Sequence, residues 1–294
     1  MPRATGVASA PAVIDCGGVS LCLDRPRIMG ILNVTPDSFS DGGAFIDPGT
    51  ALARARTMVD DGADIIDVGG ESSRPGAAPV SVDEELARVV PVISRIRAAL
   101  PGTIISIDTC KPEVMRGAVA AGASLINDIA ALRTEAALQA AAELGVPVCL
   151  MHMQGEPRTM QQAPHYEEVV RDVRAFLAAR VEACTSAGIP SGRLILDPGL
   201  GFGKTVDHNL ELLARLDELA IDGLPLLVGA SRKSMIGALL GRPAGERLYA
   251  SIALATIAAW QGAAILRVHD VRETADALAM CAAVKGKKSK VESD

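Results

Sequence analysis

One pattern recurs eight times along this chain: a short apolar run ends in a polar residue, a polar or glycine-rich loop follows, and a stretch with helical spacing comes next. Apolar runs without polar alternation predict strands that are buried on both faces, which is typical of parallel sheets. Eight such units in series predict an α/β fold, a (β/α)8 TIM barrel with its helices outside. The expected strands are 28–33, 65–68, 104–108, 124–128, 146–151, 193–197, 225–229 and 264–268.

The segments outside this series are short. Residues 13–25 predict an N-terminal β-hairpin that turns at Gly17 and Gly18. We expect residues 1–12 to be a disordered tail, 285–294 a basic and polar tail, and 13–284 a single domain. Ser81 followed by Glu84 predicts a capping box at the start of a helix. The expected helices are 49–61, 82–100, 111–121, 133–144, 166–187, 207–219, 234–261 and 271–284.

Composition excludes several classes of protein. A net charge of −6 and an aromatic content of 2% argue against a nucleic-acid-binding surface. The six cysteines are scattered without a Cys-x-x-Cys pair, so a zinc site is not expected and the reducing cytoplasm is the expected location. Apolar spans of 18 residues are absent from the sequence, so no membrane partner is expected.

Polar side chains stand at the end of every expected strand. Because the active site of a (β/α)8 barrel lies at the carboxyl ends of its strands, these residues should meet there. A helix cap or turn could explain any one of them, but not the whole series. The residues are Asn33, Asp67, Asp108, Asn127 with Asp128, His152, Asp197, Ser231 with Lys233, and Arg267 with His269.

The series divides by chemistry. Asp108, Asn127 and Asp197 offer acceptors that suit the edge of a flat heterocycle carrying several N–H groups. The side chains of Arg74, Lys233, Arg267 and His269 are donors that suit an oxyanion or a phosphate. A Schiff-base role for Lys233 stays open.

A phosphate-binding P-loop is a weaker interpretation of the segment Gly203-Lys204-Thr205. Its first glycine would have to stand at position 198, which is Pro198.

Several motifs together resemble the dihydropteroate synthase family of the folate pathway. The first signature is GILNVTPDSFSDGG at 30–43, and the second is GGESSRPG at 69–76. The segments DPGLGFGK at 197–204, SRKS at 231–234 and RVHD at 267–270 also match. The resemblance covers about residues 13–284. One departure is Ser73, where the family usually has threonine.

The resemblance implies a role for each matching position. Asn33 would bind the magnesium ion that accompanies the diphosphate. The pterin ring would be held by Asp108, Asn127, Asp197 and Lys233. The diphosphate would contact Ser73, Arg267 and His269. The aminobenzoate would lie along Arg74, Phe202 and Ser234, under a loop that carries Asp37. Of these, Asp37, Arg74, Asp108 and Lys233 are the expected catalytic residues.

The implied reaction joins 4-aminobenzoate to 6-hydroxymethyl-7,8-dihydropterin diphosphate and gives 7,8-dihydropteroate and pyrophosphate. Loss of the diphosphate would come first and attack by the amine second. Sulfonamides would inhibit by mimicking aminobenzoate. The resemblance, with the apolar stretch 250–260, also predicts a homodimer joined through the last helices.

Two related functions stay open. A corrinoid-dependent methyltransferase that binds methyltetrahydrofolate would share the Asp and Asn side chains of the pterin site. A non-catalytic pterin-binding paralogue would show a broken first or second signature, whereas both are intact here.

Overall fold

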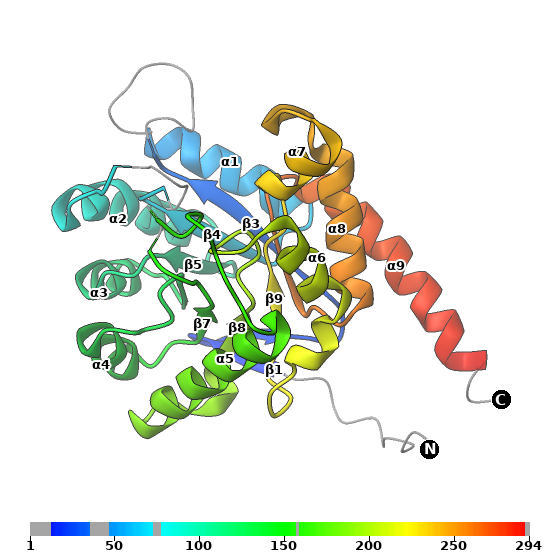
Figure 1. Cartoon of the computed structure of the whole chain (residues 1–294). Helices are drawn as coiled ribbons and strands as arrows, with labels where there is room; N and C mark the ends of the chain where they lie inside the picture. The colour runs from blue at the N-terminus through cyan, green and yellow to red at the C-terminus, as the bar shows by residue number, and fades with distance from the viewer. Residues whose placement is uncertain (1–12, 36–46, 73–77, 157–158, 292–294) are drawn as a thin grey trace.

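A computed structural model describes residues 13–35, 47–72, 78–156 and 159–291 (Figure 1). Eight parallel strands lie inside a ring of helices, which confirms the predicted barrel. Their order is β8-β7-β6-β5-β4-β3-β10-β9, and a bridge between Leu196 and Leu226 joins β8 to β9. The strands are β3 (Arg27–Asn33), β4 (Ile65–Gly69), β5 (Ile104–Asp108), β6 (Leu125–Asp128), β7 (Val148–Met151), β8 (Leu194–Asp197), β9 (Leu227–Val228) and β10 (Ile265–Val268).

The outer helices follow the predicted alternation. They are α1 (Pro48–Asp60), α2 (Val82–Ala99), α3 (Pro112–Ala120), α4 (Glu135–Leu144), α5 (Val169–Ser186), α6 (Val206–Ala214), α7 (Ser234–Leu240), α8 (Leu248–Trp260) and α9 (Val271–Val291). At α2, the Ser81 hydroxyl accepts from the Glu84 backbone N–H at 3.2 Å, as expected, while the Glu84 carboxylate pairs with Arg88. None of the helices within the described ranges is long and apolar enough to cross a membrane.

Three helices differ most from the prediction. The single helix expected over 234–261 is two helices, because Gly241 takes the left-handed conformation with φ 68° and Pro243 follows. The helix expected over 207–219 ends at Ala214 and continues only as a short 3-10 turn. The last helix is longer than predicted, and residues 285–291 are helical where a tail was expected.

An apolar layer fills the amino-terminal half of the barrel. Each barrel strand contributes one side chain, and all eight are 0–4% exposed. They are Met29, Ile65, Ile104, Leu125, Cys149, Ile195, Leu227 and Ile265. The predicted hairpin, β1 (Val13–Cys16) and β2 (Val19–Cys22), packs Ile14, Cys16 and Leu21 against this layer and closes that end of the barrel.

The strand period places the polar residues above this layer. Side chains two residues apart share one face of a strand, so the next inward positions toward the carboxyl ends are fixed by the first layer. These positions include Asp67, Asn127, Met151, Asp197 and Arg267. A barrel that is apolar at one end and polar at the other follows directly from this repetition.

Candidate active site

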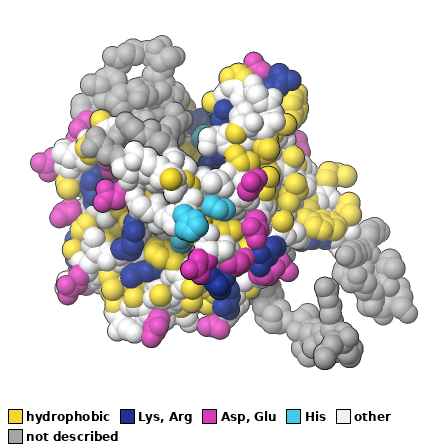
Figure 2. Space-filling model, viewed as in Figure 1, with side chains coloured by type: hydrophobic (Ala, Val, Ile, Leu, Met, Phe, Trp, Pro, Cys, Tyr) yellow, Lys and Arg dark blue, Asp and Glu magenta, His cyan; other side chains and the backbone are white. Residues whose placement is uncertain are grey.

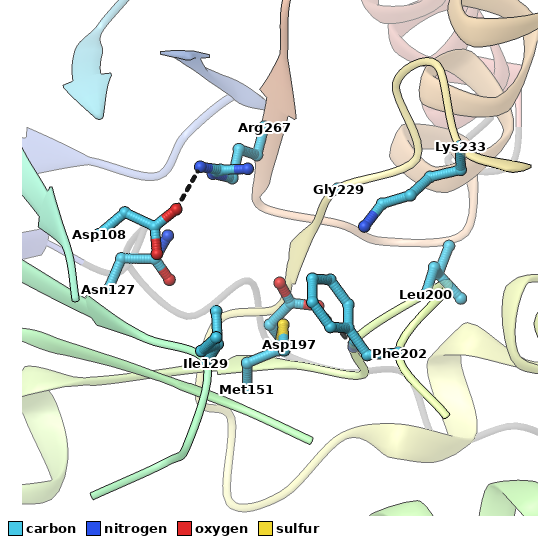
Figure 3. Close-up of a pocket in the computed structure, with 11 residues that line it drawn as sticks. Asp108, Asn127, Ile129, Met151, Asp197, Leu200, Phe202, Gly229, Lys233 and Arg267 are labelled. Atoms are coloured by element: carbon cyan, nitrogen blue, oxygen red, sulfur yellow. Dashed lines mark hydrogen bonds and ion pairs between the residues drawn. The ribbon is translucent and has the colours of Figure 1, made fainter. Parts of the chain in front are cut away.

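A guanidinium between two carboxylates forms one side of the site. The Nε of Arg267 on β10 lies 2.6 Å from Oδ2 of Asp67 on β4. Its Nη2 lies 2.7 Å from Oδ2 of Asp108 on β5 (Figure 3). The amide of Asn127 donates to the same Asp67 oxygen at 3.2 Å. The fully buried Asp67 therefore orients both Arg267 and Asn127. Its position at a strand end is evident from the sequence, but this role is not.

The protonation of Asp108 is finely balanced. Burial raises the pKa of this carboxyl to about 7, and the Asp67 carboxylate adds to the increase while Arg267 opposes it. The pKa of Arg267 is raised further by the two carboxylates, so the guanidinium stays charged. Asp108 can thus change its protonation near neutral pH beside a permanent cation.

The opposite side of the site pairs Lys233 with Phe202 and Asp197. The Lys233 ammonium lies 4.1 Å from the centre of the Phe202 ring, a cation–π contact. Burial lowers the pKa of Lys233 to about 8, and the Asp197 carboxylate opposes this change. Burial also raises the pKa of Asp197, whose Oδ1 accepts from the Gly199 backbone N–H at 2.7 Å.

These groups line one pocket (Figure 3). Its polar side chains are Asp108, Asn127, Asp197, Lys233 and Arg267, and the rest of its lining is Ile129, Met151, Gly199, Leu200, Phe202 and Gly229. Acceptors and cations at the edges with apolar side chains between them suit a flat, polar heterocycle. The chain positions are far apart, and the strand ends bring them together.

The pocket contains six of the twelve residues predicted for the site: Asp108, Asn127, Asp197, Phe202, Lys233 and Arg267. Asn33, Ser234 and His269 lie at the end of β3, the start of α7 and just after β10, and are not among the lining residues. Asp37, Ser73 and Arg74 lie outside the described residues. Met151 was missed, although it shares the inward face of Cys149 on β7.

His152 does not line the pocket, although its position at a strand end predicted that it would lie in the site. Its ring packs edge-on against Phe176 at 4.8 Å between centres, and its Nδ1 lies 2.9 Å from the Lys204 ammonium. Burial and the nearby lysine charge lower its pKa to about 3, so the imidazole is neutral. Its outward direction follows from parity, because Met151 already takes the inward position.

Beyond the pocket, the side chain of His269 meets the segment after β9. The Ser231 hydroxyl lies 3.0 Å from the imidazole Nδ1, and the His269 backbone N–H donates to the same oxygen at 3.3 Å. Arg232 takes a left-handed conformation with φ 57° and pairs with Asp270. These contacts fix His269 near the chain that enters α7.

The described part of the chain holds no group of three His, Cys, Asp or Glu side chains able to bind a metal. A side-chain oxygen is nevertheless available at the end of β3. A Cβ built on Gly69 would lie 3.5 Å from Oδ1 of Asn33 and 3.6 Å from Oδ2 of Asp108, so both oxygens border the same glycine. One amide oxygen fits a magnesium ion that also binds phosphate oxygens, and does not by itself make a closed metal site.

The sequence matches the family described as pterin binding enzymes over residues 29–269. The dihydropteroate synthase of Escherichia coli strain K12 is 56% identical over 261 residues, which cover 89% of this chain and 92% of that enzyme.

Solved structures show the same likeness. The Xanthomonas albilineans dihydropteroate synthase with 4-aminobenzoic acid has a TM-score of 0.88 at 52% identity and covers 94% of this chain and 98% of its own. The Yersinia pestis enzyme with a sulfonamide drug has a TM-score of 0.90 at 51% identity, covering 93% and 99%. A second Xanthomonas albilineans complex holds 7,8-dihydropteroate, with a TM-score of 0.85 at 50% identity and a coverage of 93% and 98%.

Proposed function

Because this chain belongs to the dihydropteroate synthase family, we propose that it condenses 6-hydroxymethyl-7,8-dihydropterin diphosphate with 4-aminobenzoate in folate biosynthesis. The enzyme is then a transferase that moves a pterinylmethyl group to an aryl amine. The observation that carries this proposal is the pocket of acceptor side chains and cations at the strand ends. Relatives solved with aminobenzoate and with dihydropteroate support the same two substrates.

In this proposal the pterin ring occupies the pocket. Asp108, Asn127 and Asp197 accept from its N–H groups, and Lys233 donates to it. As the bond to the diphosphate breaks, positive charge develops on the pterin, and the buried carboxylates stabilise that charge more than they stabilise the ground state. The neutral aryl amine then attacks the same carbon, so orientation contributes more than a strong base.

Arg267 connects the pterin to the leaving group. Its Nε and Nη2 bind the two carboxylates, and its Nη1, which bonds to none of the described residues, is available for a diphosphate oxygen. His269 is assigned to the same anion, together with Ser73 from the sequence motif. Arg74, Phe202 and Ser234 are assigned to the aminobenzoate, and Asp37 to the loop over the site.

We propose Mg²⁺ as the cofactor, held by Asn33 and by the diphosphate. The support is the single amide oxygen at the end of β3, which fits a cation that arrives with phosphate ligands. When bound, the ion stabilises negative charge on the leaving group.

We propose a homodimer that buries the apolar surface of the last helices. On α8, Tyr249, Ile257 and Trp260 are 85%, 45% and 42% exposed, and Leu240 on α7 and Met280 on α9 are also exposed. Figure 2 shows hydrophobic side chains gathered on the flank formed by these helices. A cytoplasmic location is proposed as well, supported by six free cysteines.

A pyrophosphate-release assay tests the function. Release should require both substrates, and sulfonamides should compete with aminobenzoate, as expected from the relative solved with such a drug. Pterin binding without turnover would instead indicate a non-catalytic paralogue. Methyl transfer from methyltetrahydrofolate to a corrinoid, without pyrophosphate release, would indicate the methyltransferase.

A further inference from the structure

Lys204 is a buried cation that no step of the proposed reaction uses. Its side chain is 3% exposed, and its ammonium lies 3.0 Å from the carbonyl oxygens of Gly199 and Phe202 and 2.9 Å from Nδ1 of His152. The carbonyl oxygen of His152 lies 3.4 Å away as well, so the three N–H donors of the ammonium have four acceptors within reach. Burial lowers the pKa of Lys204 to about 7, while the Asp197 carboxylate opposes the change.

Through these contacts, one ammonium binds two backbone carbonyls of the loop after β8. Gly199 and Gly203 both have left-handed φ, at 66° and 62°, and neither position tolerates a side chain. A Cβ at Gly199 would lie 1.9 Å from the carbonyl oxygen of His152, and one at Gly203 would lie 2.5 Å from that of Gln154. The loops after β7 and β8 therefore touch backbone to backbone, and Lys204 binds to both.

The loop has further fixed points on its outer side. The Tyr166 hydroxyl donates to the Gly203 carbonyl oxygen at 2.7 Å, and the Asn209 side chain accepts from the Gly201 backbone N–H at 2.6 Å. The rings of Tyr166 and His208 pack edge-on at 4.9 Å. The chain has few aromatic residues, so this cluster behind a single loop indicates a specific demand for rigidity there.

The rigid loop carries three residues that line the pocket, Gly199, Leu200 and Phe202. Phe202 lines the pocket beside Met151, and its ring lies under the Lys233 ammonium. The carbonyl of Phe202 is itself one of the acceptors of Lys204. Lys204 therefore binds the backbone of the same residue, Phe202, whose ring contacts Lys233.

We propose that Lys204 is a positioning residue of this site: it holds the 199–203 loop so that the Phe202 ring and the Lys233 ammonium keep their places in the pocket. This inference rests on the proposed function only for its activity readout. Since the residues that line the pocket are given by the structure, pterin binding to that pocket tests the inference without any measurement of turnover.

A double-mutant cycle tests the proposal. Lys204→Met keeps an unbranched side chain, one atom shorter, and removes the ammonium. We expect kcat/KM for the dihydropterin diphosphate to fall about 10–100-fold, because small displacements of a positioning contact are costly. In a Phe202→Leu background the same change should cost less than about twofold, because the ring that Lys204 is proposed to hold against Lys233 is already lost. Pterin affinity measured by calorimetry should follow the same pattern.

A matched control separates positioning from simple stability. The guanidinium of Arg97 also donates to backbone carbonyls of loops, those of Pro101 and Gly122, but these loops lie at the amino-terminal end of the barrel. Arg97→Met should lower the unfolding midpoint and leave the KM values unchanged. If Lys204→Met fails to fold, Tyr166→Phe removes one bond to the same loop, and it should give a smaller loss that Phe202→Leu again masks.

Two results overturn the inference. One is a loss on Lys204→Met, or on Tyr166→Phe, that is equally large with and without Phe202. The other is Lys204→Met with wild-type KM, kcat and pterin affinity. A wild-type protein that releases no pyrophosphate would speak against the proposed function instead, and the binding cycle would still decide the role of Lys204.

Discussion

The carboxylate of Asp67 on β4 and the guanidinium of Arg267 on β10 form an ion pair over the strand between them, β3, with Nε 2.6 Å from Oδ2. Asp67 is 0% exposed, and its other oxygen, Oδ1, has no hydrogen-bond partner among the described residues. This pair fixes the plane of the guanidinium before any ligand arrives, so Asp67 controls the direction of a group that faces the pocket.

Asp67→Asn should therefore damage both folding and function. Asp67→Asn removes one of the two carboxylates that pair with Arg267 and leaves the guanidinium with Asp108 alone, so we expect a loss of about 1–3 kcal/mol in the free energy of unfolding. We also expect kcat/KM for the dihydropterin diphosphate to fall about tenfold or more, since orientation is lost. Urea unfolding and steady-state kinetics measure the two effects.

The control is Asp64→Asn, which removes a carboxylate paired with Arg25 and Arg27 at the other end of the barrel and should change stability alone. Unchanged kinetics in Asp67→Asn would refute this role.

Pterin binding should depend on pH in both directions. Below a pH of about 7 Asp108 is protonated and loses an acceptor, because its pKa is raised, so affinity should rise as pH passes through 7. Above about 8 Lys233 loses its proton, because its pKa is lowered, so affinity should fall again. Calorimetry across pH 5.5–9.5 gives the profile. Lys233→Arg should remove only the alkaline fall; a flat profile in the wild type would contradict both assignments.

The hairpin should stabilise the barrel without affecting catalysis. Leu21 packs on the inner apolar layer and is 3% exposed, so Leu21→Ala should lower the free energy of unfolding by about 2–5 kcal/mol. Val13 on the paired strand is 56% exposed, and Val13→Ala should stay within about 0.5 kcal/mol. Equal losses in the two variants would show that the hairpin is not the closing element.

Turnover should require magnesium through the leaving group. With excess chelator the rate should fall to background, while binding of a pterin without diphosphate should be unaffected. Asn33→Ala should raise the magnesium concentration needed for half-maximal rate, because an amide oxygen near Gly69 is lost. Full activity in chelator would eliminate the metal from the reaction.

A charge in the apolar surface of α8 should separate the proposed dimer. Ile257 is 45% exposed, and Ile257→Asp should shift the mass measured by light scattering from dimer to monomer at micromolar concentration. Val13→Asp places the same charge on an exposed apolar residue of the hairpin and should leave the mass unchanged. A monomeric wild type would end this proposal.

The barrel could be predicted because each strand carries its own signal, an apolar run with a polar end. The inward layer from Met29 to Ile265 then follows from a period of two, and so does the group of acceptors above it. The same parity could have placed Met151 inside and His152 outside. Partnerships between strands could not be predicted in this way: Asp67 and Arg267 are 200 residues apart, and the period gives their inward direction but not which inward side chains lie within bonding distance of each other.

The closed amino end of the barrel has a consequence for the order of events. The layer that includes Met29 and Ile265, sealed by Ile14 and Leu21, leaves the carboxyl rim as the way in and out of the barrel. In the proposed reaction the pterin and the aminobenzoate therefore enter through the same rim. Pyrophosphate and dihydropteroate leave through it as well, so the product must leave before the next pterin can enter.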